Sequence, residues 1–369
     1  MGIKKRIVNI MLATCNFFVK MRSIKKDQIA FVTLESRQLE SDLKLLYDAL
    51  ETKDYHLVIV STSFQKNNLW TNFLYFLNLI KQVFVINTSA LVIINDNNYV
   101  ISRCKRKGVK VLQVWHAAGA IKKFGNVIPR EYPIANYDYV ICNGSYWKEP
   151  YSAAFGVSQE QVIVTGMPRL DHLCDPEFIA YARRRLYQLH PELKYKKIVL
   201  YAPTFRGDIY QGVEQVSIDA KRFIKELGSE YALLYKLHPL LKDEKLSSDR
   251  RVYNMNRYDL HELFCIADVL VSDFSSIIFD FSLLDKPIYY YVPDLEQYLD
   301  ERGCFVNYRQ LMDGCMAFDE DQLFDLIRSG KKGNEQILRS RFLDHADGKN
   351  LDRVLQLIAT ILHQPMQER

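Results

Sequence analysis

Short apolar runs alternate along this chain with longer segments of helical periodicity. The runs are rich in Val, Ile, Leu and Tyr, which is typical of strands buried on both faces of a parallel sheet. In the segments between them, apolar residues recur every three or four positions, as on one face of an amphipathic helix. The alternation predicts an α/β protein with mostly parallel sheets. The expected strands cover residues 29–34, 55–61, 90–94, 110–114, 139–142, 161–164, 197–201, 231–237 and 269–272.

These strands fall into two series, and the charged helical stretch 176–197 is the expected crossing between them. The chain has 369 residues, a length that usually corresponds to about two domains. We therefore expect two Rossmann-like domains, over residues 27–175 and 176–345. A basic amphipathic segment would precede them over residues 1–26, and a C-terminal helix and tail would follow over residues 346–369.

Composition narrows the class of protein only slightly. Hydrophobic residues make up 48% and charged residues 25%, as in an ordinary globular protein, so neither disorder nor a fibrous repeat is indicated. The net charge of +5 suits an anionic partner, which leaves nucleic acid, a membrane surface and a phosphorylated substrate open. The seven cysteines are scattered without a CxxC pair, which argues against a disulfide framework and a zinc site and favours a reducing cytoplasm.

Two segments are candidates for contact with a membrane surface. Lysines and arginines flank the apolar run 7–19, which is too short to span a bilayer and has no clear signal-peptide cleavage site. It predicts an interfacial helix whose basic residues meet anionic lipid. Residues 64–86 have a broad apolar face with lysines at its edges and suit the same role. For both segments the alternative is a helix packed on its own domain.

Polar residues follow the ends of five predicted strands, where ligand sites of open α/β sheets lie. His116 comes after the strand 110–114, with Lys122 and Lys123 nearby, and a histidine there can act as a general base. In isolation, a single His is more often structural. The other four polar strand ends are residues 166–171, 202–206, 236–239 and 272–276. For Arg169 and Asp171, which lie in the stretch 166–171, the simpler explanation is a local ion pair.

The stretch 267–291 combines a buried strand, a polar turn with Asp273, Ser275 and Ser276, and a helix. Backbone N–H groups and hydroxyls at the positive end of a helix can bind phosphate, although the serines could also simply cap the helix. Two Rossmann-like halves facing each other across a cleft would bring all five strand ends together around a pyrophosphate. No Walker A sequence, GxGxxG or carboxylate cluster is present, so a P-loop kinase or a dehydrogenase is not supported.

Five motifs carry a resemblance to a known family. In chain order they read WHAAGAIKKFG, TGMPRLD, LYAPTFRG, YKLHP and SDFSSIIFDFSLLDKPIYYY, and they lie within residues 110–308. Together they resemble the CDP-glycerol glycerophosphotransferase family of teichoic acid biosynthesis. The resemblance implies a GT-B-like fold, with an acceptor- and membrane-side domain followed by a domain that binds the CDP-polyol. It also implies an enzyme that attaches peripherally to the cytoplasmic face of the bacterial cell membrane.

The resemblance further implies the partners of the protein. These are a CDP-polyol donor, an undecaprenyl-diphosphate-linked disaccharide acceptor and an anionic membrane surface, with no nucleic acid, no cofactor and no assigned metal site. His116 would be the general base on the acceptor hydroxyl, and His238 would contact the donor pyrophosphate. Ser275 and Ser276 would bind the donor phosphates at the helix end.

The remaining candidates for substrate binding are less specific. Arg206 and Lys236 would add positive charge, and Asp273 would help to hold the pyrophosphate beside the serines. Asp280 would orient donor groups or, equally, serve only to pack its helix. Arg169 and Thr204 complete the set, because both lie at polar strand ends.

A departure from the family pattern decides between a priming and a chain-extending enzyme. Ala117 and Ala118 follow His116, where chain-extending members often have Gly, and the chain is short. We therefore expect a priming enzyme that transfers one glycerol phosphate from CDP-glycerol and releases CMP. A CDP-ribitol or polymerising transferase for teichoic acid or capsule, a GT-B nucleotide-sugar glycosyltransferase and a non-catalytic membrane scaffold remain the alternatives.

Overall fold

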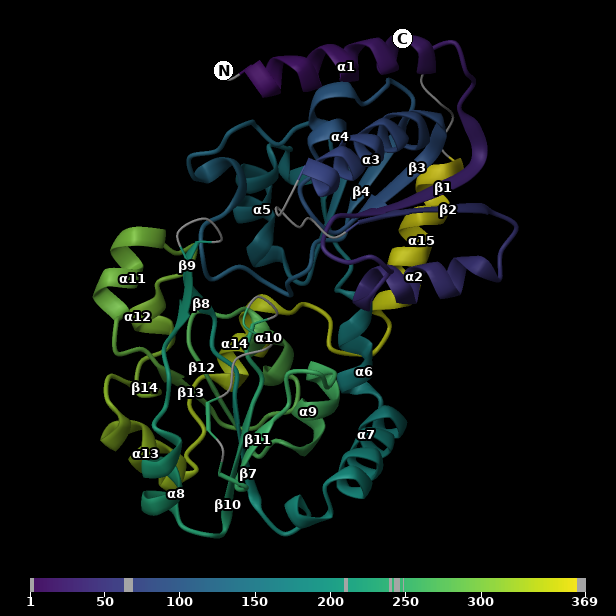
Figure 1. Cartoon of the computed structure of the whole chain (residues 1–369). Coiled ribbons are helices and arrows are strands. Elements are labelled where there is room, and N and C mark those ends of the chain that lie inside the picture. Colours follow the sequence, from purple (N-terminus) through teal and green to yellow (C-terminus); the bar gives the residue numbers. More distant parts are fainter. Residues whose placement is uncertain are drawn as a thin grey trace. The chain divides into compact units, whose positions relative to one another are not determined.

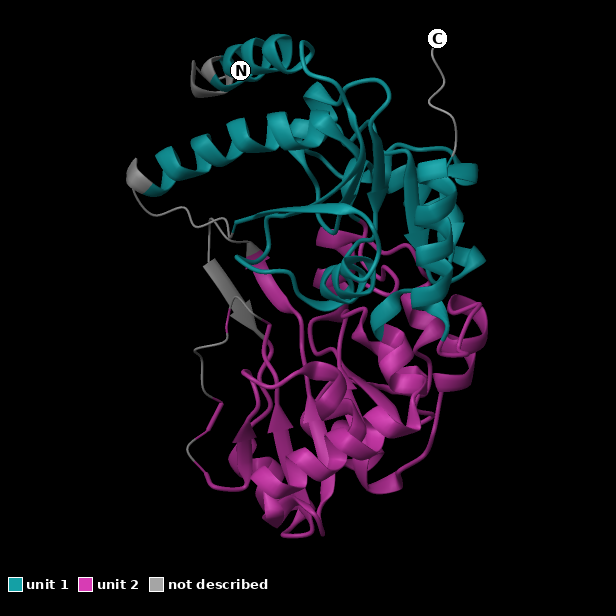
Figure 2. Cartoon of the chain, turned by 90° about the vertical axis from the view of Figure 1, so that its right-hand side faces the viewer, with its two compact units in different colours: residues 1–116, 124–169, 349–369 teal, residues 117–123, 170–348 magenta. Residues whose placement is uncertain are grey.

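A computed structural model describes residues 3–62, 69–208, 212–238, 241, 246–247 and 249–363 of the chain. Apart from one short antiparallel pair, their strands form two six-stranded sheets in which all neighbouring strands run parallel. This confirms the predicted α/β class with two Rossmann-like parts. Figure 1 shows the strands and the helices around them. The chain divides into two compact units, coloured teal and magenta in Figure 2. Unit 1 comprises Met1–His116, Phe124–Arg169 and Lys349–Arg369, and unit 2 comprises Ala117–Lys123 and Leu170–Gly348.

Unit 1 contains the first sheet, with strand order β2-β1-β3-β4-β5-β6. Its strands are β1 (Lys25–Thr33), β2 (His56–Ser61), β3 (Ser89–Ile94), β4 (Lys110–Gln113), β5 (Tyr139–Cys142) and β6 (Val162–Val164). Its helices are α1 (Ile3–Val19), α2 (Ser41–Glu51), α3 (Leu69–Thr88), α4 (Tyr99–Cys104), α5 (Lys148–Phe155) and α15 (Asn350–His363), with short 3-10 turns η1 (Gly125–Val127), η2 (Ser145–Trp147) and η3 (Gln159–Gln161).

The core of unit 1 joins the first and last parts of the chain. On one face of the sheet, Ile29 and Phe31 of β1 pack in a cluster with Leu46 of α2 and with Val354 and Ile358 of α15. Alternate residues of the same strand point to the opposite face and are buried as well, which explains the continuous apolar runs in the sequence. The C-terminal helix therefore belongs to the fold of unit 1.

Helices α1 and α3 each bury one face and expose apolar side chains on another. Leu12 and Val19 of α1 are buried, whereas Ile10 and Phe17 of the same helix are 68% and 67% exposed. Residues 64–68, and the side chains of Leu69 and Trp70, lie outside the described residues. None of the helices in the described part of the chain has the length and apolar character needed to cross a membrane.

Unit 2 contains the second sheet, with strand order β11-β10-β7-β12-β13-β14, and a separate antiparallel pair of strands. Its strands are β7 (Lys197–Tyr201), β10 (Tyr231–Tyr235), β11 (Val252–Asn254), β12 (Val269–Ser272), β13 (Ile288–Tyr291) and β14 (Met316–Ala317), with β8 (Phe205–Asp208) and β9 (Gly212–Gln215) as the pair. Its helices are α6 (Asp171–Cys174), α7 (Pro176–Leu189), α8 (Ala220–Leu227), α9 (Leu260–Ile266), α10 (Ile277–Ser282), α11 (Leu295–Arg302), α12 (Tyr308–Leu311), α13 (Glu320–Ser329) and α14 (Glu335–Phe342), with 3-10 turns η4 (Pro168–Leu170), which starts in unit 1, and η5 (Pro191–Leu193).

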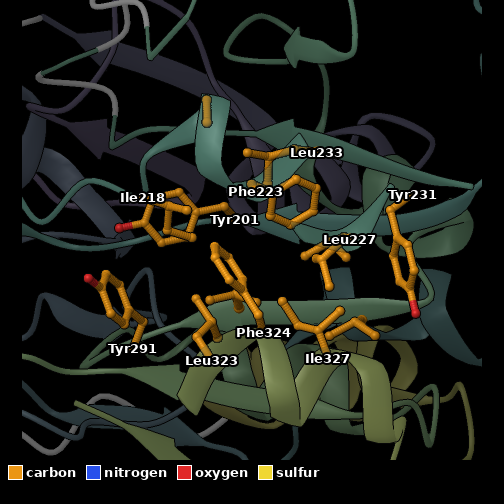
Figure 3. Close-up of a cluster of buried hydrophobic side chains, with 14 of the residues drawn as sticks. Tyr201, Ile218, Phe223, Leu227, Tyr231, Leu233, Tyr291, Leu323, Phe324 and Ile327 are labelled. Carbon is orange, nitrogen blue, oxygen red and sulfur yellow. The ribbon is translucent and has the colours of Figure 1, made fainter. Parts of the chain in front are cut away.

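A large hydrophobic cluster fixes the second sheet, and Figure 3 shows its side chains. Phe223 and Leu227 of α8 face Phe324 and Ile327 of α13, and Leu233 of β10 completes this part of the cluster. The rings of Phe223 and Phe324 meet edge to face with their centroids 6.0 Å apart. Burying each such side chain contributes about 1.5–3 kcal/mol, so the cluster gives the strand ends of unit 2 a rigid base.

The chain passes between the units after His116, Lys123, Arg169 and Gly348, and α7, which was expected to be the crossing, packs on α9 within unit 2. The short segment 117–123 is held as an edge of unit 2. The backbone N–H of Phe305 donates to the carbonyl of Ile121 over 2.8 Å, and Lys122 forms an antiparallel bridge with Cys304.

Candidate functional site

His116 lies in unit 1, where the carboxyl ends of three neighbouring strands meet. Glu35 follows β1, Asn95 follows β3, and His116 follows β4. The His116 Nδ1 atom is 2.9 Å from Glu35 Oε1 and 3.1 Å from the backbone oxygen of Asn95. The side chains of His116 and Glu35 are 45% and 41% exposed, so a substrate can reach them. The predicted placement of His116 at a strand end is therefore confirmed.

The partners of His116 determine which ring nitrogen carries the proton. A carboxylate oxygen and a carbonyl oxygen can only accept from Nδ1, so in the neutral ring the proton lies on Nδ1. Nε2 then carries the lone pair. Among the described residues, Nε2 has no hydrogen-bond partner. The ring is thus arranged to take up a proton at its exposed nitrogen.

The backbone just before His116 is in an unusual conformation, and the rings of Trp115 and His116 lie with their centroids 3.9 Å apart. Trp115 has φ of +55°, which costs a bulky residue on the order of 1–3 kcal/mol. Its ring is buried and stacks on Phe124 with the centroids 4.7 Å apart, while His116 stays at the surface. Its backbone N–H donates to Oε1 of buried Gln113, whose amide donates in turn to the carbonyl of Asp96. These contacts stabilise the strained turn and fix the position of His116.

Asp96 is a buried carboxyl group beside this cluster. Its Oδ2 accepts from the backbone N–H of Leu34 over 2.6 Å, and its Oδ1 has no hydrogen-bond partner among the described residues. Burial raises the pKa of Asp96 to about 7, and the charge of Glu35 adds to the rise. The amide of Leu34 and the positive form of His116 act in the opposite direction. The group therefore titrates near neutrality.

Arg169 is held in a buried ion pair within unit 1. Its guanidinium pairs with Asp42 of α2, and its backbone N–H donates to Asp42 Oδ1 over 2.8 Å. The preceding Gly166 has φ of +75°, and a Cβ atom there would lie 2.0 Å from Oδ1 of Asn350. The Thr165–Asp171 motif thus joins α2 and the start of α15 to the sheet, which gives Arg169 a structural role in its own unit.

In unit 2, the ends of β7 and β12 are joined by a network around Asp273. Asp273 Oδ1 accepts from the backbone N–H of Thr204, and Oδ2 accepts from Arg206, both over 2.8 Å. The Tyr308 hydroxyl donates to the Asp273 carbonyl. Burial raises the pKa of Asp273, although Arg206 opposes the rise. The structure therefore brings together three of the predicted residues, Thr204, Arg206 and Asp273.

Arg206 is fixed from several sides. Its Nε donates to Asp294 Oδ2 over 2.6 Å, and Nη2 donates to Asp294 Oδ1 over 3.0 Å, which is a bidentate contact. The guanidinium also lies over the rings of Phe274 and Tyr298, 5.2 and 4.6 Å from their centroids. Two carboxylates and two rings leave this cation rigid and largely neutralised.

Lys122 brings a second cation to this network from the segment 117–123. Its Nζ donates to the Thr204 hydroxyl over 3.0 Å and lies 5.6 Å from the centroid of the Phe205 ring. Burial lowers the pKa of Lys122, and the Asp273 carboxylate opposes this change. An ammonium group has three donors, so donors remain for a ligand.

His238 follows β10 and the serine turn follows β12, the two strands that flank β7 in the sheet of unit 2. The His238 ring meets the same Phe205 ring with the centroids 4.7 Å apart, whereas Pro239 lies outside the described residues. Ser275 and Ser276 are half-buried directly after Asp273 and Phe274. Within the described part of the chain, the Ser276 hydroxyl makes no capping hydrogen bond to α10, so the simple capping explanation is wrong for this serine.

Two predicted residues point away from the network. The Lys236 ammonium donates to the carbonyls of Asn256 and Tyr258 over 3.2 and 2.6 Å, and burial lowers its pKa. Asp280 is buried against α9, where its Oδ2 is 3.1 Å from Nε2 of His261. These contacts favour structural roles for both residues, and for Asp280 they match the helix-packing alternative.

Comparison with known proteins identifies the family. A family model described as CDP-Glycerol:Poly(glycerophosphate) glycerophosphotransferase matches residues 14–360. The chain belongs to this family. The resemblance predicted from the five motifs is thereby confirmed, and with it the assignment as a phosphotransferase enzyme, while the roles of individual residues remain predictions.

Curated relatives within the family have different polyols in their names. The chain is 31% identical to a teichoic acid glycerol-phosphate primase of Bacillus subtilis (strain 168), over 78% of this chain and 77% of the relative. It is 29% identical to a teichoic acid ribitol-phosphate primase of Bacillus spizizenii, over 92% of each. It is also 29% identical to a teichoic acid poly(ribitol-phosphate) polymerase of that organism, of which it spans only 59%.

Among solved structures, the chain resembles the wall teichoic acid polymerase TagF. The TM-score is 0.76 at 20% sequence identity, and the match covers 98% of this chain and 95% of the other. At this identity the likeness shows the fold, and it confirms the GT-B-like architecture.

Several residues of the two clusters were missing from the predicted site. Glu35, Asn95 and Asp96 follow β1 and β3, and a search for polar residues at every strand end would have found them. Lys122 was noted as a basic residue after His116, but its contact with Thr204 joins positions far apart in the sequence. Among the described residues, no group of three or more His, Cys, Asp or Glu side chains could hold a metal ion.

Proposed function

We propose that this protein transfers glycerol phosphate from CDP-glycerol to a hydroxyl of a lipid-linked disaccharide and releases CMP. Membership of the family and the likeness to a glycerol-phosphate primase support this activity. The observation that carries the mechanism is the surroundings of the His116 ring, in which Nδ1 faces two acceptors and Nε2 has no hydrogen-bond partner among the described residues. Nε2 takes the proton of the acceptor hydroxyl as its oxygen attacks the β-phosphorus, and the bond to CMP breaks. General base catalysis contributes typically about 10²–10⁴-fold.

The donor pyrophosphate fits the polar strand ends of unit 2. Lys122 offers ammonium donors beside Thr204, while Ser275 and Ser276 offer hydroxyls. The His238 ring and the Lys122 ammonium both lie beside the ring of Phe205. Fixed donors aimed at the phosphates stabilise the charge that develops on the leaving CMP. Arg206 is paired with two carboxylates, so its contribution is to hold Asp273 and the loop after β7 in place.

Ribitol phosphate is a second candidate for the transferred group. The match to a ribitol-phosphate primase extends over 92% of both chains, which is a longer alignment than that with the glycerol-phosphate primase. The chemistry at the phosphorus is the same for both polyols, so the mechanism above applies to either donor.

A lipid-linked acceptor requires the protein to work at a membrane surface. Ile10, Phe17 and Phe18 of α1 are exposed, and the basic residues Lys20 and Arg22 follow directly. An apolar face bordered by cations suits the interface of an anionic bilayer. We therefore place the protein at the cytoplasmic face of the bacterial membrane as a peripheral enzyme.

The deciding experiment compares donors on the purified full-length chain. Radiolabelled CDP-glycerol, CDP-ribitol and UDP-sugars are each incubated with a lipid-diphosphate-linked disaccharide, and release of the nucleotide and the size of the product are measured. We expect CMP release with a CDP-polyol and a product larger by one unit. Turnover only with a UDP-sugar, or no turnover with any donor, would overturn the proposal. A long polymer as the product would show that the enzyme polymerises and does not prime.

Two substitutions test the residue roles separately. His116→Ala should lower turnover about 10²–10⁴-fold, to a residual rate, while CDP-glycerol still binds, because the base does not hold the donor. His238→Ala should weaken donor binding. A His116→Ala enzyme with the wild-type rate, or a His238→Ala enzyme with unchanged donor affinity, would contradict the respective role.

A further inference from the structure

We propose that Glu35 is the positioning residue of His116 and that Asn95 holds Glu35 in place. The inference rests on the proposed role of His116 as the general base. Glu35 does not touch the reacting atoms in this arrangement, because it contacts Nδ1 while the proton is transferred at Nε2. Its effect is exerted through the imidazole ring.

The geometry links three side chains on three neighbouring strands. Asn95 Nδ2 donates to Glu35 Oε2 over 2.8 Å, and Glu35 Oε1 is 2.9 Å from His116 Nδ1. Each carboxylate oxygen therefore has its own partner, and the plane of the carboxylate is fixed. The backbone oxygen of Asn95 lies 3.1 Å from the same Nδ1, so Asn95 contacts both members of the pair.

The positions of these residues follow from the register of the sheet. Val32 of β1 pairs with Ile94 of β3, and Ile94 pairs with Gln113 of β4, so the three strands end side by side. The chain continues from each end directly into the cluster. At the turn with φ of +55°, the Trp115 ring is buried, and the next residue, His116, has its Nδ1 beside Glu35.

Glu35 would contribute to the reaction in two ways. It keeps the proton on Nδ1, so the lone pair stays on the exposed Nε2 in every neutral ring. It also offsets the positive charge that forms on the ring when Nε2 accepts the hydroxyl proton. A neutral glutamine at this position could still accept from Nδ1, but it would lose the charge and could also present its NH₂ group.

The simpler explanation of the pair is an ordinary ion pair at the surface. Exposed pairs contribute only about 0–1 kcal/mol to stability, so removing the Glu35 charge should not unfold the protein. This makes Glu35→Gln a clean probe of catalysis. Glu40→Gln is the matched control, because Glu40 lies in the same loop, is exposed and accepts a hydrogen bond from Ser36.

The experiment measures kcat and both KM values of the full-length enzyme with the CDP-polyol that it uses. For Glu35→Gln we expect kcat to fall about 10- to 100-fold, a part of the contribution of the base, with both KM values and the melting temperature unchanged. Asn95→Ala should lower kcat less, because Glu35 keeps its charge. Glu40→Gln should behave as the wild type.

A double-mutant cycle tests whether Glu35 acts through His116. If it does, Glu35→Gln should cost nothing further in the His116→Ala background, because the ring that it positions is gone. A Glu35→Gln enzyme that matches Glu40→Gln, or a loss that is fully additive with His116→Ala, would overturn the inference and leave the proposed function standing. A His116→Ala enzyme with full activity would remove the base assignment and this inference with it.

Discussion

Asp96→Asn should make the protein more stable than the wild type at pH 8. The loss of a carboxylate that is paired in the folded protein usually has the opposite effect. The wild-type carboxyl group is buried and accepts from the Leu34 amide through Oδ2, so its proton at low pH lies on Oδ1. An asparagine can present its oxygen to Leu34 and its NH₂ group where that proton was. The variant is therefore a permanent copy of the protonated state.

The magnitude follows from the shift in pKa. In the folded protein, burial raises the pKa of Asp96 from 3.8 to about 7. In the unfolded chain the group is solvated and keeps the lower value. Each unit corresponds to about 1.4 kcal/mol, so ionising the folded protein at Asp96 costs about 4 kcal/mol more than ionising the unfolded chain. Between about pH 4 and pH 7 the folded state holds one more proton than the unfolded state. Wild-type stability therefore falls as the pH rises through this window, whereas Asp96→Asn lacks this fall.

The assay is thermal or urea unfolding of both proteins between pH 4.5 and pH 8.5. We expect equal stability at the acidic end and an advantage for Asp96→Asn at pH 8 that approaches about 4 kcal/mol for the transition of unit 1. At about 2–4 °C per kcal/mol, this is a separation near 10 °C. Asp48→Asn is the control, because Asp48 is about half exposed and forms its ion pair with Lys44 on α2. Parallel profiles of the wild type and Asp96→Asn would refute the reasoning.

Other substitutions test the remaining parts of the structure. Arg206→Ala removes the arginine that pairs with buried Asp273 and should destabilise the protein by about 3–5 kcal/mol in urea unfolding, whereas Arg309→Ala removes an exposed pair and should leave the unfolding transition nearly unchanged. Equal losses would contradict the network. Phe17→Ser on the exposed face of α1 should weaken sedimentation with anionic liposomes, and Tyr195→Ser, an exposed aromatic position in unit 2, should not. Loss of binding in both variants, or in neither, would count against α1 as the contact.

The fold was predictable because its signals are local. Among the described strands of the two sheets, nine were expected from short apolar runs, whereas β11, β13 and β14 were not among the expected strands. The caps agree with the helices, as where the Asp259 side chain accepts from the backbone of His261 and Glu262 at the start of α9. The assignment of α15 to unit 1 was not predictable, since it depends on the packing of Val354 and Ile358 against strands that begin the chain. Nothing in the periodicity of a helix specifies which of two sheets it covers.

The site was predictable to the extent that it follows strand ends. His116, Thr204 and Asp273 were found in this way, and the structure places them after β4, β7 and β12. The same rule fails for the direction of a side chain. Lys236 follows β10 as expected, yet its ammonium turns to the carbonyls of Asn256 and Tyr258. A lysine next to a site can satisfy the nearest oxygens, and the sequence does not tell which oxygens these are.

The role of Asp273 illustrates how contacts revise a motif. An acidic residue beside two serines was expected to help hold a pyrophosphate, but a carboxylate and a phosphate repel each other. Its two oxygens accept from the Thr204 amide and from Arg206, so its charge is used inside the protein. Asp273 thereby fixes the loop after β7, where the Thr204 hydroxyl accepts a hydrogen bond from Lys122. The acid in this turn is best explained as the anchor of the loop after β7, and the proposed contact with the donor phosphates falls to the serines beside it.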